Sequence, residues 1–123
     1  MLIDDSEVDI YINKNMLQIS EFAENVLVKH SAQEALDFLN KESENVEALP
    51  SVIFLDLMMP GMDGFGFLKE FEKLPNTVHN SCKIIVLTSS VHQQDHDRAM
   101  QNRFVSAFMT KPLYAGKLSE IKL

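Results

Sequence analysis

The stretch VIFLDLMMPGMDG, residues 52–64, holds the clearest strand of the chain and the turn that follows it. Val52 to Leu55 are apolar at every position, which predicts a strand buried on both faces, as in the centre of a parallel sheet. Asp56 ends the apolar run, and the segment from Pro60 to Gly64 is rich in turn-forming residues. The pattern predicts a central parallel strand with an acid at its carboxyl end, followed by a structural turn at Asp63-Gly64.

Short apolar runs alternate with helical patterns over the rest of the chain. Further strands are predicted at residues 1–3, 26–28, 84–87 and 105–109. Helices are predicted to begin at Ser6 and Ser31, which start capping-box patterns with Asp9 and Glu34, and to include residues 67–71 and 94–101. Residues 41–49 and the segment from Pro75 are predicted to be loops. Five strands alternating with four or five helices predict one α/β domain with a doubly wound parallel sheet.

Length and composition fit a single globular domain. The chain has 123 residues, 46% hydrophobic and 24% charged, so we expect a packed core rather than disorder. The single cysteine, Cys82, excludes a disulfide framework and a cysteine-rich zinc module, and we expect an inert thiol.

Hydropathy and charge limit the location and the partners of the chain. No apolar run approaches the ~20 residues that span a bilayer, and no signal peptide precedes the predicted fold, so we expect a cytoplasmic location without membrane insertion. The net charge of -7 disfavours direct contact with nucleic acid and favours a bound cation or a basic partner.

Polar side chains follow the predicted strands where a doubly wound sheet binds its ligand, beyond the carboxyl ends of the strands. They are Asp4, Asp5, Asp56, Thr88 and Lys111. Three ionised carboxylates repel one another unless a cation lies among them. Oxygen ligands suit magnesium, and no histidine or cysteine ends a predicted strand, which argues against zinc. A magnesium ion beside an ammonium and a hydroxyl suits phosphoryl transfer, with Asp56 on the central strand as the candidate nucleophile.

The same residues lie in four motifs that resemble the receiver domain of two-component response regulators, over nearly the whole chain. The motifs are Leu2-Ile3-Asp4-Asp5, residues 54–64 (FLDLMMPGMDG), Val86-Leu87-Thr88-Ser89 and Thr110-Lys111-Pro112. Each is weak alone, but their order and spacing together are specific. The resemblance implies a fold like that of the chemotaxis regulators: flavodoxin-like, with strand order 2-1-3-4-5 and helices on both faces of the sheet.

The resemblance also implies a phosphoacceptor and a metal site. Asp56 would accept a phosphoryl group from a phosphohistidine on a sensor histidine kinase or a histidine phosphotransfer protein. Asp4, Asp5 and Asp56, with the backbone carbonyl of Met58, would hold Mg²⁺, for which Mn²⁺ is a candidate substitute.

Two further residues would bind the phosphoryl group, and one would report on it. Thr88 would donate a hydrogen bond to one phosphoryl oxygen, and Lys111 would pair with another. Thr88 and Phe108 would form the switch, in which the aromatic ring turns inward when the threonine moves; core packing is the alternative role for Phe108. The Lys111–Pro112 peptide bond is cis in the family.

The resulting functional hypothesis is a phosphorylation switch rather than a conventional enzyme. Transfer to Asp56 would be largely self-catalysed, and a weak autophosphatase activity would reset the domain. A downstream protein would read the face formed by the fourth helix, the fifth strand and the last helix. Kinase specificity is predicted to lie in the first helix near Asn13, Asn15 and Met16. Residues 1–123 would form one receiver domain, with a first strand and a last helix that look clipped and with no output domain.

Two alternatives from other functional classes are less well supported. A phosphohydrolase with an aspartyl-phosphate intermediate usually needs a second acid two residues after the nucleophile, and that position is Met58, which cannot move a proton. A binding module that keeps the fold without the chemistry should lack one of the acids, the threonine or the lysine, and all are present.

Overall fold

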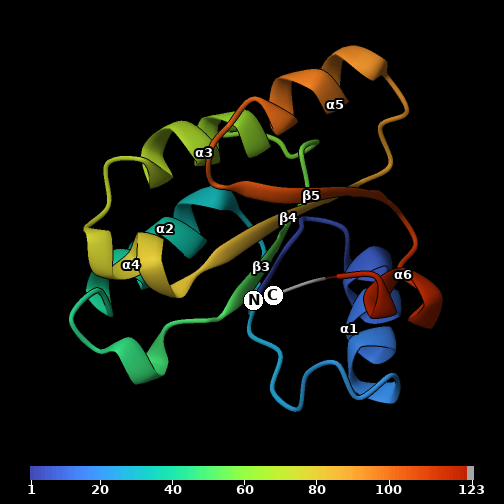
Figure 1. Ribbon diagram of the computed structural model, residues 1–123, viewed down its shortest axis with the longest axis horizontal. Coiled ribbons are helices and arrows are strands. Elements are labelled where there is room, and N and C mark those ends of the chain that lie inside the picture. Colours follow the sequence, from blue (N-terminus) through green and yellow to red (C-terminus); the bar gives the residue numbers. More distant parts are fainter. Residues whose placement is uncertain (122–123) are drawn as a thin grey trace.

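The computed structural model describes residues 1–121, in which strands and helices follow one another along the chain (Figure 1). The strands are β1 (Leu2–Ile3), β2 (Val28–Lys29), β3 (Val52–Leu55), β4 (Lys83–Thr88) and β5 (Val105–Thr110). The helices are α1 (Glu7–Ile19), α2 (Ala32–Lys41), α3 (Gly64–Phe71), α4 (Asn76–Ser81), α5 (Gln93–Met100) and α6 (Ala115–Ser119), with a short 3-10 helix, η1 (Val46–Ala48).

The five strands form one parallel sheet in the order β2-β1-β3-β4-β5, which confirms the predicted topology. The central strand, β3, pairs with β1 on one side and β4 on the other, so that Leu55 lies opposite Ile3 and Val86. All four residues of β3 are buried, as expected for a strand covered on both faces. The order changes direction between β1 and β3, and ligands of doubly wound sheets bind beside this point.

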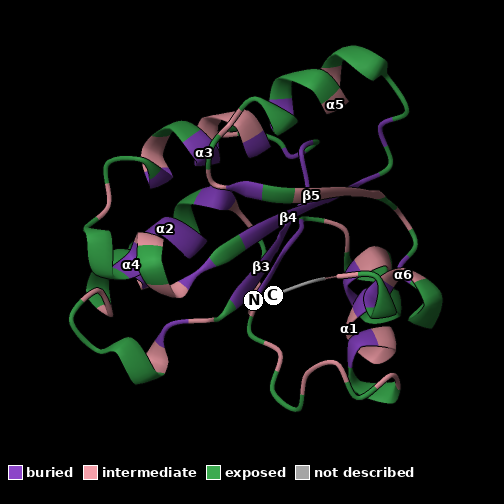
Figure 2. Cartoon of the chain, viewed as in Figure 1, coloured by how far each residue is buried: buried purple, intermediate pink, exposed green. Residues whose placement is uncertain are grey.

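Helices cover both faces of the sheet, as predicted (Figure 1). On one face, α1 and α6 pack through Ile10, Leu17 and Leu118 against side chains of β1, β3 and β4. On the other face, α2, α3, α4 and α5 pack against the alternate residues of the same strands. Figure 2 shows this arrangement as buried strands between helices whose outer surfaces are exposed. Two apolar layers therefore hold the strand ends in fixed positions.

The two predicted capping boxes are each half formed. The side chain of Ser6 accepts a hydrogen bond from Asp9 N (3.3 Å), and Ser31 accepts one from Glu34 N (3.1 Å). The reciprocal bonds are replaced: Ser6 N donates to Asp4 Oδ1 (3.0 Å) instead of Asp9, and the Glu34 carboxylate accepts from His30 N (3.1 Å) instead of Ser31 N. Both helices therefore begin where predicted, while the carboxylate of Asp9 is available for another partner.

Two predictions about elements were wrong. The edge strand predicted at residues 26–28 lies at Val28–Lys29, because its pairing with Leu2 and Ile3 sets its position rather than its hydropathy. The loop predicted from Pro75 contains α4, a six-residue helix whose sequence NTVHNS has one buried side chain, Val78. A helix so short and polar has too little apolar periodicity to be detected.

Candidate functional site

Backbone hydrogen bonds align the carboxyl ends of the strands. Asp56 N donates to Ile3 O (3.1 Å), which places Asp56 beside the end of β1. Lys111 N donates to Thr88 O (2.9 Å), which ties the segment after β5 to the last residue of β4. Because neighbouring parallel strands end at one edge, residues from distant parts of the sequence meet there.

The ammonium of Lys111 lies at the centre of the site. Its Nζ is 2.6 Å from Asp4 Oδ2, 3.0 Å from Asp56 Oδ2 and 2.9 Å from Asp9 Oδ2. The Lys111 side chain is 8% exposed, and those of Asp4 and Asp56 are 1% and 5% exposed. Water therefore has little access to the Lys111 ammonium and to the carboxylates of Asp4 and Asp56, and the Asp9 side chain is partly exposed.

Burial and charge act in opposite directions on this group. Burial raises the pKa of Asp56 above its ordinary value, against the hydrogen bonds from Met58 N and Lys111 that lower it. Burial alone would lower the pKa of Lys111, but hydrogen bonds to Asp4, Asp9 and Asp56 raise it above its usual range. Lys111 therefore stays charged, and Asp56 depends on it as a counter-ion.

The acids fit a divalent cation. Asp4, Asp5 and Asp56 each offer a carboxylate oxygen within 4.8 Å of the others. Asp4 Oδ2 is buried and lies 2.6 Å from the ammonium of Lys111, with no further partner among residues 1–121. Three carboxylates this close together, two of them buried, are the kind of donor set that Mg²⁺ prefers. The backbone of Met58 contributes an N–H to Asp56 Oδ1 (3.1 Å), and its carbonyl remains a predicted ligand.

The sequence matches the model of the response regulator receiver domain over residues 1–121. The chain belongs to this family. It is 29% identical to the two-component response regulator ORR1 of Oryza sativa subsp. japonica over 124 residues, 99% of this chain and 52% of that protein. It is 28% identical to the response regulator Rcp1 of Synechocystis sp. over 112 residues, 90% of this chain and 74% of that protein. The receiver domain thus spans about half the length of ORR1.

Solved structures of response regulators share the fold. A response regulator receiver protein from Dyadobacter fermentans superposes with a TM-score of 0.86 at 30% identity, covering 97% of this chain and 90% of the other. A two component response regulator from Cytophaga hutchinsonii also gives 0.86, at 26% identity, covering 96% and 88%. Receiver domains are phosphoacceptor modules in two-component signalling, and they take phosphoryl groups from histidine kinases.

Thr88 and Phe108 lie on neighbouring strands of the receiver domain. Thr88 is fully buried, and its hydroxyl oxygen accepts a hydrogen bond from Ser90 N (3.2 Å). Phe108, on β5, is half-buried, and its ring meets His96 of α5 edge-on at 5.0 Å between centroids. The aromatic residue therefore connects β5 with α5, two of the three elements in the predicted output face.

The turn after Asp56 is held by a close approach of backbones. Asp63 caps α3 by accepting a hydrogen bond from Gly66 N (2.8 Å). A Cβ at Gly64 would lie 2.6 Å from Asp56 O and 2.7 Å from Leu57 Cα. Only glycine leaves room for the helix to start so near the site. The predicted structural role of Asp63-Gly64 is confirmed.

Two residues of α1 differ from the sequence-based predictions. Asp9 contacts Lys111 but was predicted only as a capping residue; its place in the first turn of the helix after the strand-end acids is the signal that could have revealed it. Asn13 was predicted to contribute to kinase specificity, but its side chain is 1% exposed and accepts a hydrogen bond from Leu113 N (3.1 Å). Asn13 therefore fastens the segment before α6 and cannot contact a partner, so that prediction was wrong. Asn15 and Met16 are half-buried.

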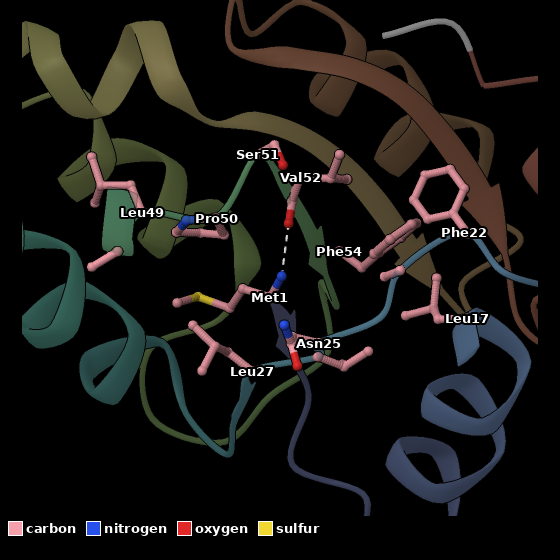
Figure 3. A pocket seen from close by; sticks show the side chains of 13 residues that line it. Met1, Leu17, Phe22, Asn25, Leu27, Leu49, Pro50, Ser51, Val52 and Phe54 are labelled. Atoms are coloured by element: carbon pink, nitrogen blue, oxygen red, sulfur yellow. Dashed lines mark hydrogen bonds between the residues drawn. The ribbon is translucent and has the colours of Figure 1, made fainter. Parts of the chain in front are cut away.

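A cavity of about 280 Å³ (Figure 3) is lined by Met1, Ser51 and Val52 at the starts of β1 and β3, whereas the acids follow the other ends of these strands. Its lining residues, which include Leu17, Phe22, Val52 and Phe54, carry no charged side chain. The hydrogen bond drawn there joins Met1 N to Val52 O (2.8 Å). The cavity lacks the groups that phosphoryl transfer needs, and the acidic site has them.

None of the helices within residues 1–121 combines the length and apolar character that a membrane span needs.

Proposed function

We propose that this receiver domain is a phosphorylation switch whose phosphoacceptor is Asp56. One observation carries the proposal: the Asp56 carboxylate lies at the end of the central strand, 3.0 Å from the Lys111 ammonium and within 4.8 Å of the acids Asp4 and Asp5. A nucleophile, a counter-ion for phosphoryl oxygens and a group of metal ligands therefore share one edge of the sheet.

The proposed reaction transfers a phosphoryl group and leaves the acceptor covalently modified. A carboxylate oxygen of Asp56 attacks phosphorus as the bond from phosphorus to the imidazole nitrogen of a phosphohistidine breaks. The electron pair of that bond stays with the imidazole. Hydrolysis then adds water across the acyl phosphate, which regenerates the Asp56 carboxylate and releases inorganic phosphate. Acetyl phosphate can replace phosphohistidine, with acetate as the leaving group.

Residues of the domain provide most of the catalysis, so we infer that the donor protein supplies mainly the phosphoryl group. Lys111 would offset charge on the phosphoryl oxygens, and Thr88 would donate a hydrogen bond to one of them. Mg²⁺, or Mn²⁺ in its place, would be held by Asp4, Asp5, Asp56 and the Met58 carbonyl, and would neutralise charge on the oxygens during transfer. The domain would therefore take one phosphoryl group in each transfer and become modified itself, unlike a conventional enzyme. It would lose the group again through a weak autophosphatase activity.

Phosphorylation replaces the single negative charge of the Asp56 carboxylate with close to two on the phosphoryl group, and it brings new acceptor oxygens into the site. We infer that Thr88 exchanges its contact with Ser90 for one with the phosphoryl group, and that the ring of Phe108 moves into the space released. Phe108 lacks a hydroxyl, so an inward position buries apolar surface without leaving a polar atom unpaired. A downstream protein that prefers the rearranged surface of α5, β5 and α6 would read the signal.

The donor is a sensor histidine kinase or a histidine phosphotransfer protein, and we propose that it docks on α1. The outer surface of this helix exposes large apolar side chains: Val8 (68%), Tyr11 (71%), Ile12 (43%) and Ile19 (77%). Exposed apolar residues beside a reactive site favour a protein partner. We propose that these exposed residues, rather than the buried Asn13, determine which kinase the domain binds. We propose a cytoplasmic location, where the thiol of Cys82 would remain reduced.

Intact-protein mass after incubation with acetyl phosphate tests the phosphoacceptor. The unmodified chain should gain one phosphoryl group when Mg²⁺ is present and none when it is chelated. Asp56→Asn should gain none, because an amide is a poor nucleophile. Asp63→Asn is a matched control, since it makes the same change in an exposed acid that only caps α3.

Two further measurements separate the alternatives: a turnover assay with small phosphate esters, and incubation with a phosphorylated phosphotransfer protein. Fast catalytic release of phosphate from small phosphate esters would indicate a phosphohydrolase. No adduct on the unmodified chain from acetyl phosphate or from a phosphorylated phosphotransfer protein would indicate a binding module and would contradict the proposed function.

A further inference from the structure

The acid that joins the site without being part of the strand-end group is Asp9. It lies in the first turn of α1, and its Oδ2 accepts a hydrogen bond from Lys111 Nζ (2.9 Å), across 102 positions of the sequence. The contact connects the helix proposed to bind the phosphodonor with the cation proposed to bind the phosphoryl group. Among residues 1–121, Lys111 is the one residue of the proposed phosphorylation site that the Asp9 side chain contacts.

Three carboxylates surround the Lys111 ammonium: those of Asp9 and Asp56 accept hydrogen bonds from it, and that of Asp4 forms an ion pair with it. An ammonium has three donors and no acceptor, and Asp4, Asp9 and Asp56 each place an oxygen within 3.0 Å of Nζ. A phosphoryl group on Asp56 brings acceptor oxygens that need a donor from the same ammonium. The contact with the Asp56 carboxylate then passes to the phosphoryl oxygens, and these oxygens compete with the carboxylates of Asp4 and Asp9 for the same ammonium.

Burial indicates which contact is given up. The side chain of Asp4 is 1% exposed, so loss of the lysine would leave a buried, unpaired charge there, whereas the charge of phosphorylated Asp56 lies on the phosphoryl oxygens. The side chain of Asp9 is 38% exposed, so its carboxylate can turn into water at little cost. Asp9 is also outside the group of three acids that fits a cation. The Asp9 contact is the one that can be made and released repeatedly.

We propose that Lys111 exchanges Asp9 for a phosphoryl oxygen when Asp56 is phosphorylated, and that Asp9 thereby competes with the phosphoryl group for the lysine. Asp9 is then a positioning residue that acts through Lys111. It keeps the ammonium in the site before transfer and lowers the stability of the phosphorylated form after it. The inference rests on the proposed function and adds to it a residue that sets how strongly the site holds its phosphoryl group.

Binding of beryllofluoride, a mimic of the phosphoryl group, measures the competition at equilibrium. The affinity of the Mg²⁺-loaded domain is obtained by titrating fluoride at fixed beryllium and following the backbone amide signal of Met58 by NMR. Asp9→Asn should bind the mimic about two- to fivefold more tightly than the unmodified chain, the effect expected when a partly exposed ion pair is removed.

Glu7→Gln is the matched control for Asp9→Asn. Glu7 lies in the same turn of α1, and its 79% exposed side chain pairs with His30 rather than with Lys111. The Glu7→Gln variant loses one negative charge near the start of α1 but keeps all contacts of Lys111. Its affinity for beryllofluoride should therefore equal that of the unmodified chain. An equal gain in both variants would mean that general charge acts instead of competition, and would overturn the proposal.

The NMR signal of the Lys111 side-chain nitrogen gives a readout that a purely structural role would not produce. Without the mimic, this signal should differ between the unmodified chain and Asp9→Asn, because the contact is present in one and weakened in the other. With the mimic bound, the two signals should coincide, because the residue at position 9 then contacts the lysine in neither protein. Signals that still differ in the bound state would show that Asp9 keeps the lysine, and would overturn the exchange.

Failure of the exchange and failure of the proposed function give different results. If the unmodified chain takes up neither a phosphoryl group nor beryllofluoride, the phosphoacceptor role is wrong, and with it the inference. If the unmodified chain takes up both and Asp9→Asn shows unchanged affinity, only the role of Asp9 is wrong. Overlapping amide spectra of the variants away from α1 confirm that each is folded.

Discussion

At the residue scale, burial controls the chemistry of Cys82. Removal from water raises the pKa of its thiol from the ordinary value of 9.0 to about 11, and the side chain is 5% exposed. The thiolate is the reactive form, so we expect alkylation by iodoacetamide at pH 8 to be much slower in the folded domain than in urea. The folded state also holds the proton more tightly, so this group's contribution to stability is complete below pH 9 and is lost as the pH rises toward 11.

Labelling followed by intact-mass analysis checks this expectation. Equal rates in native buffer and in urea would show that the thiol is accessible and its pKa unshifted. Because Cys82 is remote from the acids by sequence and by its position before β4, its protection should also be the same with and without Mg²⁺.

The residues of the site differ in how visible they are in the sequence. Three residues of the site come at the ends of predicted strands: Asp4, Asp56 and, one residue further on, Lys111. Parallel strands in one sheet bring such residues to one edge, so their proximity could be predicted. Asp9 lies on a helix, where its direction depends on how α1 packs and on the carboxylate of Asp4 taking the Ser6 N–H. Asn13 is polar, and its burial depends on a single partner 100 positions away. No local pattern contains that information.

At the element scale, the start of α3 is the point where a structural change should be felt in the site. We expect Gly64→Ala to destabilise the fold by about 1–3 kcal/mol, since the new Cβ would lie under 3.0 Å from backbone atoms of Asp56 and Leu57. The backbone that must shift carries the proposed phosphoacceptor, so phosphorylation by acetyl phosphate should also slow. Urea unfolding and intact-mass time courses measure the two effects.

Gly66→Ala is the control within the same helix. Its Cβ would meet the Cγ atom of the Met62 side chain at 2.8 Å, and a flexible side chain can move. Alanine also favours helix over glycine by about 1 kcal/mol, so this variant should be close to neutral and should be phosphorylated at the normal rate. Equal losses in both variants would contradict the close-approach argument and indicate a general effect of substitution in α3.

The elements themselves follow local physics to different degrees. The fully apolar run of β3 and the serine caps of α1 and α2 are strong signals, and these elements lie where predicted. The edge strand β2 depends on pairing with β1, which local hydropathy does not describe. The helix α4 is held by one buried residue, Val78, against the core of the same face. Weakly patterned elements are therefore positioned by their neighbours.

At the scale of the whole molecule, the strand order brings the acids that follow β1 and β3 to one place on the edge that they share with Lys111. Alternation of strands and helices predicts a doubly wound sheet, but several strand orders satisfy that alternation. The order 2-1-3-4-5 came from the resemblance to receiver domains, and the structure confirms it. In this order β3 lies between β1 and β4, so that Asp56 is next to the acids of β1 and on the side of Thr88.

We expect the stability of the domain to depend on divalent cations, because the net charge is -7 and three acids lie close together. A ligand that binds only the folded state stabilises it by RT ln(1 + [L]/Kd), or about 2.7 kcal/mol at a hundred times Kd. We therefore expect the Tm to rise with the logarithm of the MgCl₂ concentration. NaCl at equal ionic strength should give a smaller rise, because screening lessens repulsion without occupying the site.

Asp5→Asn should reverse the order of stability in the two conditions. The Asp5 side chain is exposed, so an amide is tolerated there, and its charge lies within 4.8 Å of two other carboxylates. Without Mg²⁺ the variant loses like-charge repulsion and should melt above the unmodified chain. With Mg²⁺ it lacks a ligand, so most of the rise in Tm should disappear and the unmodified chain should be the more stable.

Glu47→Gln removes an exposed charge on η1, away from the strand ends, and should follow the unmodified chain in both conditions. An Asp5→Asn variant that keeps the full response to Mg²⁺ would show that Asp5 is no part of the cation site. A destabilised variant in metal-free buffer would show that repulsion among the three acids does not limit the fold.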